Sequence, residues 1–322
     1  MWVAEFNSIK VFYGRNSLSY LNQLGLNQVT IVVTKSLLNS RLLKKMENYV
    51  NIKRIIQGPS HHIPEEELNI LIKELSMEST VISLGGGSII DAVKLAFSGY
   101  HIAIPTTLSG AEYTYNASFK NKDGFKVSRR VKNPDVIILD PEVLEYTPKS
   151  LLITTAVKAL DHAVEAYYSN KASPFTDVLS AQGINMMLKC LENNLDDLEF
   201  CQIASWISSY ARKFAGMGIS HSFGHVFGPK FNIPHGVTSC ISLPEAIRFN
   251  KSEKLSSIYP NLDRRIENIL NNLGINERLS KYAKFEDIVE LLPKFVEAVN
   301  SGSNPKKITM EDAKMFVKNV YY

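Results

Sequence analysis

The stretch that decides the fold is VISLGGGSIIDAVKLA, residues 81–96. It has the pattern of a buried strand, three glycines, Ser88 at an N-cap and an amphipathic helix. Backbone N–H groups at such a helix start can receive a pyrophosphate, and glycines leave room for its close approach. The spacing differs from GxGxxG, and a plain strand-to-helix turn also favours glycine. By itself the stretch is therefore a weak prediction of a phosphate site.

Runs rich in β-branched residues alternate with amphipathic segments around this stretch. The strand-like runs are residues 29–34, 52–58, 80–85 and 101–105, and the helical segments between them are 40–50, 64–75 and 88–99. This repetition predicts a parallel sheet with helices on both faces. A hairpin with Asp123-Gly124 as its turn and one more strand at 135–140 follow.

A second polar loop follows the next strand. The sequence IPTTLSGAE, residues 104–112, carries Thr106, Thr107 and Ser109. Because the carboxyl ends of parallel strands meet at one edge of a sheet, we expect this loop and the glycine loop to line a dinucleotide crevice together.

The pattern changes after residue 147. From Pro148, which suits the first turn of a helix, nearly every segment has helical periodicity. We therefore predict an α/β dinucleotide-binding domain over residues 1–147 and an all-helical domain over residues 148–322. The cleft between two such domains is the expected ligand site.

Composition and charge narrow the function class. The net charge of +4, from 36 basic and 32 acidic residues, predicts no nucleic-acid binding. One basic run, residues 119–132, is interpreted as a solvated hairpin, with a nearby phosphate or acidic ligand as the alternative. The chain start lacks a basic stretch followed by an apolar run, and no window is long and apolar enough to span a membrane. We expect a cytoplasmic protein without a membrane partner.

The three cysteines are Cys190, Cys201 and Cys240. They are odd in number, widely spaced and contain no CxxC pair, so the sequence predicts reduced thiols rather than a zinc or redox motif.

Four of the seven histidines lie in two segments of the second domain. GISHSFGHVFGPKFNIPHG holds His221, His225 and His235, and TTAVKALDHAVEAYYS holds His162. Neutral imidazole is a common ligand of zinc and iron, and His221 and His225 at i and i+4 would share one helix face. We interpret four histidines brought together by two helices and a loop as a functional site.

A catalytic metal site usually also includes a carboxylate, and helical geometry places none well. Lys158 stands one turn before His162 on the same face. Asp161 lies about 100° round the helix and would reach the site only from its edge, and Glu165 is expected on the far side. An ammonium 4 Å from a divalent ion would repel it by about 8 kcal/mol at an effective dielectric constant near 20.

Taken together, six motifs resemble the iron-containing (group III) alcohol dehydrogenases, above all their maleylacetate reductase branch. In chain order they are GGGSIIDAVKLA, IPTTLSGAE, ILDPEVL, ALDHAVEAYYS, GISHSFGHVFG and FNIPHGVTSCISLPEAIRFN. The resemblance implies an α/β domain that binds NAD(P), a helical second domain and the architecture shared with dehydroquinate synthase. It also implies hydride transfer between nicotinamide and a carbonyl or alcohol, with oxo-acids as a substrate class.

The resemblance also implies roles for single residues. Positions that match cofactor contacts are Gly86, Gly87, Ser88, Asp91, Thr106, Thr107, Asn116 and Lys126. In metal-dependent members an Asp and three His bind the ion. His162, His221 and His235 match those histidines, and His225 matches one beside the nicotinamide. Lys158 stands at the Asp position, from which maleylacetate reductases also depart.

We therefore predict a catalytic set of Lys158 and the four histidines, and we favour a metal-free site over one in which three histidines hold iron or zinc. The Lys158 ammonium would stabilise the alkoxide in place of the ion, and His225 would relay the proton.

Lys35 follows the strand-like run 29–34, at a turn where the family often carries an Asp that binds the adenosine ribose. A cation there predicts a preference for NADP(H) over NAD(H). The alternative function is that of a dehydroquinate synthase-type lyase or cyclase that uses NAD transiently. The expected partner is a small carbonyl or alcohol substrate, and a homodimer is the assembly that the sequence allows.

Overall fold

The structure is a computed structural model that describes residues 8–322. Most of the chain start, where the sequence predicts no leader, lies outside the described residues. The chain divides into two compact units, which we call the N-terminal unit, ending at Leu152, and the C-terminal unit, beginning at Ile153. This division falls inside helix α5 (Lys149–Tyr168). The domain boundary at residue 147 stays a prediction.

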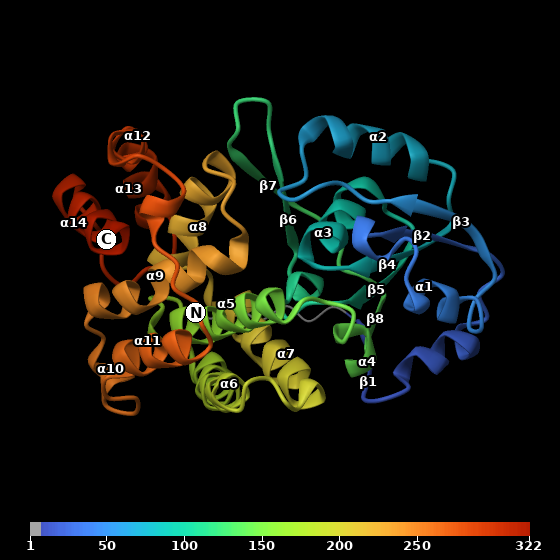
Figure 1. The fold of residues 1–322 in the computed structure, drawn as a ribbon, viewed down its shortest axis with the longest axis horizontal. Helices are drawn as coiled ribbons and strands as arrows, with labels where there is room; N and C mark the ends of the chain where they lie inside the picture. The colour runs from blue at the N-terminus through green and yellow to red at the C-terminus, as the bar shows by residue number, and fades with distance from the viewer. Residues whose placement is uncertain (1–7) are drawn as a thin grey trace. The chain divides into compact units, whose positions relative to one another are not determined.

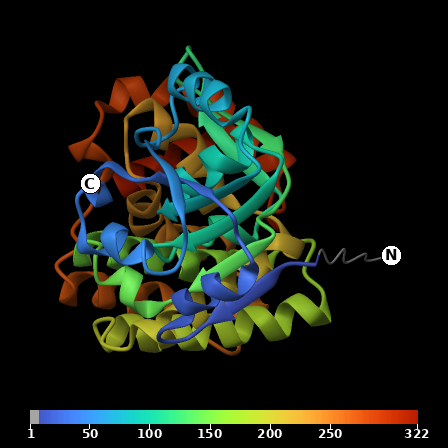
Figure 2. The ribbon, with the colours of Figure 1, turned by 90° about the vertical axis from the view of Figure 1, so that its right-hand side faces the viewer.

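The N-terminal unit is built on a six-stranded sheet, in the order β1-β8-β5-β4-β2-β3, in which every pair is parallel (Figures 1 and 2). Its strands are β1 (Lys10–Tyr13), β2 (Val29–Val33), β3 (Ile52–Gln57), β4 (Thr80–Gly85), β5 (Tyr100–Pro105) and β8 (Val136–Leu139). Its helices are η1 (Ser17–Leu24), η2 (Lys35–Leu37), α1 (Arg41–Met46), α2 (Glu65–Leu75), α3 (Gly87–Ala96), η3 (Ala111–Tyr113) and α4 (Pro141–Leu144). The predicted α/β sheet is confirmed.

Both faces of this sheet are covered. Successive side chains of a strand point to opposite faces, so Ile31 and Val33 pack with η1 and α1, while Val32 packs with α2 and α3. Burial on both faces explains why the strands are continuous apolar runs in the sequence.

A two-stranded antiparallel hairpin, β6 (Asn116–Lys120) and β7 (Lys126–Arg130), stands apart from the main sheet. Gly124 has φ +84° in the turn, a conformation that suits glycine, so the predicted hairpin and its Asp123-Gly124 turn are confirmed. The basic run lies on this hairpin, where the Arg129 guanidinium lies 4.8 Å from the centre of the Phe119 ring.

The C-terminal unit is helical, as predicted. After α5 it contains α6 (Pro174–Glu192), α7 (Leu198–Ala215), α8 (Ile219–Lys230), α9 (His235–Asn250), α10 (Glu253–Ser256), α11 (Leu262–Asn272), η4 (Leu279–Lys281), α12 (Phe285–Val289), α13 (Leu292–Ser301) and α14 (Met310–Tyr321). From Leu152 to Ser169 every residue of the α5 segment is buried. Because a helix buried on all sides has no solvent-facing side, the charged residues of α5 lie in the protein interior.

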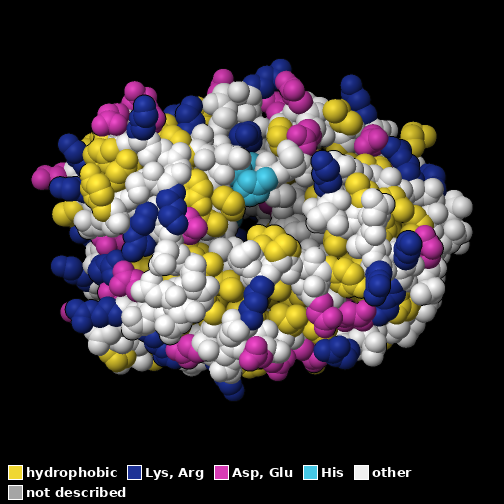
Figure 3. Space-filling view, in the orientation of Figure 1, with side chains coloured by type: hydrophobic (Ala, Val, Ile, Leu, Met, Phe, Trp, Pro, Cys, Tyr) yellow, Lys and Arg dark blue, Asp and Glu magenta, His cyan; other side chains and the backbone are white. Residues whose placement is uncertain are grey.

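The distribution of charge and the hydropathy of the helices can both be compared with the composition. Basic and acidic side chains are interspersed over the face shown in Figure 3. None of the helices among residues 8–322 is long and apolar enough to cross a membrane.

Cys190 and Cys201 form a disulfide between the end of α6 and the start of α7. The prediction of reduced thiols is therefore wrong for these two, because the loop between the helices brings together cysteines that are eleven positions apart. Cys240 is a free, buried thiol.

Candidate active site

The glycine loop connects β4 to α3 in the N-terminal unit. The N-cap of α3 is Gly86, in an extended conformation, so the prediction of Ser88 at the N-cap is wrong and the helix begins earlier. Side chains of the second loop lie close to the backbone of the glycine loop. A Cβ added to Gly86 would lie 3.1 Å from Thr107 Cγ2, and one added to Gly87 would lie 2.8 Å from Ser109 Oγ. The two predicted loops therefore do lie together.

The strand order places these loops at an edge suited to a nucleotide. Strands β4 and β5 are neighbours, and β2 lies on the other side of β4. The chain leaves β2 toward β3 and leaves β4 toward β5, in opposite directions across the sheet, which makes the β2/β4 carboxyl ends a topological switch point. Lys35 follows β2 at this edge and is exposed.

A buried lysine that the sequence analysis missed supports the second loop. Lys94 of α3 is closed off from solvent, and its ammonium donates to an Asp91 carboxylate oxygen at 3.0 Å. It also donates to the backbone oxygens of Ala111 and Asn116, at 2.8 and 3.0 Å. Asp91, predicted to contact the cofactor, is thus engaged with Lys94. Asn116 and Lys126 begin the two hairpin strands.

Helix α5 brings three charged side chains into the interior of the C-terminal unit. Lys158, Asp161 and Glu165 are at most 1% exposed. The expectation that Asp161 reaches the site only from its edge and that Glu165 lies on the far side is wrong, because α5 is buried on every side and α8 and α9 pack where solvent was expected. Carboxylates therefore lie close to the histidines.

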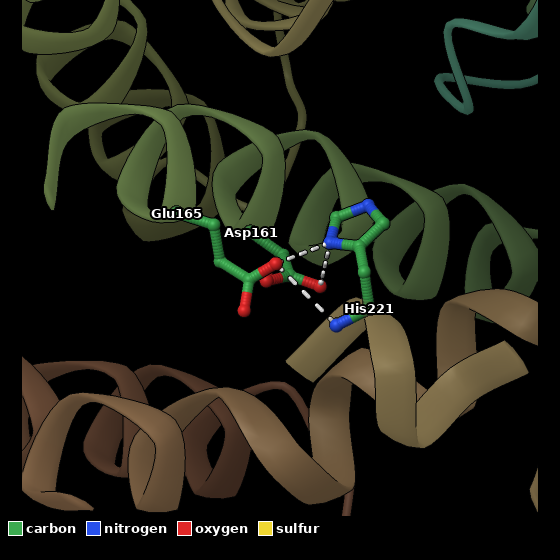
Figure 4. Close-up of side chains that lie close together, drawn as sticks. All are labelled: Asp161, Glu165 and His221. Carbon is green, nitrogen blue, oxygen red and sulfur yellow. Dashed lines mark hydrogen bonds and ion pairs between the residues drawn. The ribbon is translucent and has the colours of Figure 1, made fainter. Parts of the chain in front are cut away.

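Glu165 holds the start of α8 and the ring of His221 (Figure 4). Its two oxygens accept backbone N–H bonds from Gly218 and Ser220, at 2.8 and 2.7 Å. His221 Nδ1 lies 2.7 Å from Glu165 Oε2. Since both carboxylate oxygens act as acceptors, Nδ1 carries the proton and donates it to this bond. His221 Nε2, on the other side of the ring, is buried and has no hydrogen-bond partner among the described residues.

The Lys158 ammonium forms an ion pair with Asp161, with Nζ 3.1 Å from Oδ2. The same oxygen accepts hydrogen bonds from Ser239 at 2.6 Å and Ser220 at 3.0 Å. One ligand atom each from Asp161, Glu165 and His221 lies within 4.8 Å of the others, an arrangement able to hold a metal ion. The Lys158 ammonium already supplies a cation to Asp161, and His221 Nδ1 is hydrogen-bonded to Glu165, so this side of the ring is a satisfied network.

The remaining histidines lie around His221 and His235. The ring centre of His221 lies 5.0 Å from that of His162 and 6.3 Å from that of His235, and the His225 ring lies 5.7 Å from His235. His162 Nδ1 lies 3.3 Å from Ser209 Oγ. His162 and His221 are buried, and His225 and His235 are half-buried. The structure thus brings all four predicted histidines together with Lys158.

Burial sets the charge of the cluster. Desolvation lowers the pKa of His162 and His221 well below the usual range, so both imidazoles are neutral. Desolvation also lowers the pKa of Lys158, against the opposing charges of Asp161 and Glu165. Burial and the Asp161 charge raise the pKa of Glu165 to about 8.

Two family models together match most of the chain. The model described as "Iron-containing alcohol dehydrogenase" matches residues 8–141, and that described as "Fe-containing alcohol dehydrogenase family, C-terminal" matches residues 152–321. The chain belongs to the iron-containing alcohol dehydrogenase family.

Relatives of several activities share this family. The NADPH-dependent butanol dehydrogenase of Clostridium saccharobutylicum is 27% identical over 97% of this chain and 96% of its own length. Maleylacetate reductase 1 of Rhodococcus opacus is 31% identical over 61% of this chain and 58% of its own. A solved putative alcohol dehydrogenase from Ralstonia eutropha has a TM-score of 0.88 at 22% identity, covering 100% of this chain and 98% of that one, which shows the fold.

Family membership confirms the predicted function class. The chain is an oxidoreductase that transfers hydride between a nicotinamide nucleotide and an alcohol or carbonyl compound. No observation favours the dehydroquinate synthase-type alternative.

Proposed function

We propose that the histidine cluster of the C-terminal unit is the reaction centre of an NAD(P)-dependent carbonyl reductase. The observation that carries this proposal is the state of His221. Its Nδ1 is held by Glu165, which leaves on Nε2 a lone pair that meets no partner among residues 8–322, in a ring that stacks on the neutral imidazole of His162. A buried nitrogen lone pair of this kind suits a cation or a proton donor as its partner.

The residues fit a divalent metal ion. His162, His221 and His235 would hold it, and three histidines are a known ligand set of catalytic zinc. A histidine that donates its other ring N–H to a carboxylate, as His221 does to Glu165, is the usual arrangement around a metal ligand. When bound, such an ion supplies a Lewis acid that polarises a carbonyl oxygen.

This proposal replaces the prediction of a metal-free site. That prediction relied on the absence of a nearby carboxylate, and Asp161 and Glu165 both lie beside the cluster. The charge of Asp161, which pairs directly with Lys158, offsets the repulsion between Lys158 and a divalent ion. The family name also points to iron.

Lys158 and His225 would stabilise the substrate oxygen and supply its proton. Lys158 keeps N–H donors beyond its bond to Asp161, and these could donate to the substrate oxygen where negative charge develops. His225, half-buried, can exchange a proton with solvent and pass it to that oxygen. Lys158 and the four histidines therefore remain the proposed catalytic set.

The loops of the N-terminal unit would bind the dinucleotide. The backbone N–H groups of Gly86, Gly87 and Ser88 at the start of α3 suit the pyrophosphate. Thr106 and Thr107 of the second loop, and Asn116 and Lys126 of the hairpin, would complete the contacts. The exposed Lys35 at the end of β2 supports NADP(H) over NAD(H), because its ammonium can pair with a 2′-phosphate.

Small alcohols, aldehydes and ketones are the proposed substrates, with oxo-acids as a further class because the cluster contains a buried lysine. A cytoplasmic location and a homodimer are part of the same proposal, which includes no nucleic-acid or membrane partner.

The test combines turnover with metal analysis. The purified chain is assayed for NADPH and NADH oxidation over small aldehydes, ketones and oxo-acids, before and after chelation, and its iron and zinc are measured. We expect stoichiometric consumption of reduced nucleotide, loss of activity in chelator and its recovery with added metal. Activity indifferent to chelator in metal-free protein would return the site to the Lys158 mechanism, and turnover without net nucleotide oxidation would reject the reductase.

A further inference from the structure

The buried Lys158 ammonium lies beside imidazoles that suit a cation, so two positive charges would compete for one site. A buried ammonium lies inside the same cluster as imidazoles suited to a cation, and like charges at close range oppose each other strongly where water is excluded. Either the ammonium excludes a metal ion or something nearby cancels its charge.

Asp161 is placed to cancel it. One of its oxygens accepts from the Lys158 ammonium and from the hydroxyls of Ser239 and Ser220. Its other oxygen, Oδ1, is buried and has no hydrogen-bond partner among the described residues. The carboxylate is therefore fixed by three donors on one oxygen and keeps unused acceptor capacity on the other.

A second unpartnered atom lies in the same cluster. His221 Nδ1 is 3.5 Å from Asp161 Oδ2, and Nε2 of the same ring is buried and meets no partner within the described part of the chain. Figure 4 shows that His221 turns Nδ1 toward the carboxylates and Nε2 away from them. The carboxylates and Nε2 thus lie on opposite sides of one imidazole.

We propose that Asp161 is the positioning residue that allows a lysine to stand among these histidines. It neutralises Lys158, and the matched pair sets the affinity of the imidazoles for a divalent cation. This inference rests on the proposed function, since it concerns the same histidine site, but it makes its own claim about charge.

The pair predicts opposite effects for its two members. Lys158→Met leaves an unpaired carboxylate, so we expect the Kd for Zn²⁺ and Co²⁺ to fall at least tenfold. Asp161→Asn leaves an unpaired ammonium, so we expect the Kd to rise at least a hundredfold. The double variant removes both charges and should return to within about threefold of the wild-type chain, because charges that cancel leave little net effect.

The experiment uses the full chain, freed of metal by chelation and titrated with Zn²⁺ and Co²⁺ against a chromophoric chelator. The Co²⁺ absorption spectrum reports the ligands directly, without an activity assay. Lys132→Met is the matched control, since Lys132 also pairs with an aspartate three residues on, Asp135, but at an exposed site of the N-terminal unit. Its Kd should equal that of the wild-type chain.

The outcomes separate the two proposals. If the wild-type chain, the Lys158→Met and Asp161→Asn variants and the double variant all bind metal with Kd values within threefold, the role of Asp161 is overturned and the histidine site stands. If only Lys158→Met binds metal, the charge inference stands and the metal in the proposed function is rejected. If none binds metal, both are overturned. Circular dichroism checks folding, and Lys158→Gln and Asp161→Ser replace any variant that does not fold.

Discussion

Two buried lysines, one in each unit, stand three positions from an aspartate on their own helix. Lys94 satisfies its three N–H donors with four acceptors: Asp91 Oδ1, Ala111 O, Asn116 O and Thr114 Oγ1. Lys158 has one acceptor among the described residues, Asp161 Oδ2. The Asp91–Lys94 pair therefore links several backbone segments of the N-terminal unit. The Lys158–Asp161 pair instead leaves an ammonium with few hydrogen bonds beside the imidazoles.

The order of charges on the helix also differs. Asp91 precedes Lys94, the order that favours the helix dipole, whereas Lys158 precedes Asp161. Local helix energetics thus support the first pair and not the second. Both ammonium groups have an aspartate partner. The number of other acceptors therefore distinguishes the structural lysine, Lys94, from the lysine at the proposed reaction centre, Lys158.

The largest expected effect comes from breaking the fully satisfied lysine. Lys94→Met should lower the free energy of unfolding of the N-terminal unit by about 3–5 kcal/mol, because it removes the buried ammonium and leaves Thr114 as the donor to the oxygens of Ala111 and Asn116. Adding Asp91→Asn should not restore the loss. Urea unfolding followed by circular dichroism measures it, with the exposed Lys73→Met as the control expected within about 0.5 kcal/mol of wild type. A full rescue by the second substitution would contradict this account.

The second pair should behave differently. Lys158→Met or Asp161→Asn alone should cost about 3 kcal/mol, because each leaves one buried charge uncompensated. The double variant should come within about 1 kcal/mol of wild type, since no other acceptor depends on Lys158. Fluorescence of Trp206 during urea unfolding reports the C-terminal unit. Additive losses in the double variant would show that the comparison is wrong.

The pKa of His101 extends the comparison of the two lysines, because the charge of Lys94 contributes to it. Burial, and then the charges of Lys94 and Lys132, lower the pKa of His101 to about 3 from 6.5. Below pH 6.5 the unfolded chain binds a proton that the folded chain refuses, so this stability is present above about pH 6.5 and is lost as the pH falls toward 3. At pH 5 the loss should be about 2 kcal/mol.

His101→Gln can keep a hydrogen bond to Ser83 and removes this titration. Its unfolding free energy, measured by urea denaturation at pH 5 and pH 7.5, should therefore fall by about 2 kcal/mol less than that of the wild-type chain. Equal losses in the two proteins would assign the acid sensitivity to other groups.

The smallest expected effect concerns an exposed lysine. Lys35→Asp should move the ratio of kcat/KM for NADPH and NADH at least tenfold toward NADH, about 1.4 kcal/mol, because a carboxylate repels a 2′-phosphate and can bind a ribose hydroxyl. Steady-state kinetics with both nucleotides measure it, and Lys73→Asp is the control. An unchanged ratio would remove Lys35 from the cofactor site.

The sequence predicted the N-terminal unit well because its signals are local. Continuous β-branched runs, glycines after β4 and the Asp123-Gly124 turn each act within a few residues, and the structure confirms the elements they predict. The start of α3 was misplaced because Ser88 is a good N-cap by type, whereas the glycines allow the helix to begin before it.

The site was predicted only in part, and the missing part depends on packing. The four histidines and Lys158 were found from their spacing, but Glu165 was assigned to the far side of a helix that is buried on every side. The nearly continuous apolar and small residues of α5 were the available signal for this burial. The Cys190–Cys201 disulfide was missed because spacing alone does not show how a loop between two helices folds back.

One feature of the sheet bears on how the protein is made. Within residues 8–322, strand β1 pairs in the sheet with β8 alone, and that partner is synthesised more than a hundred residues later. While the ribosome is still translating residues before 136, β1 has no strand to pair with, and its backbone edge is open to other chains. The sheet of the N-terminal unit is therefore complete only when translation has reached the end of that unit, and chains that stop earlier should be the ones that need chaperones.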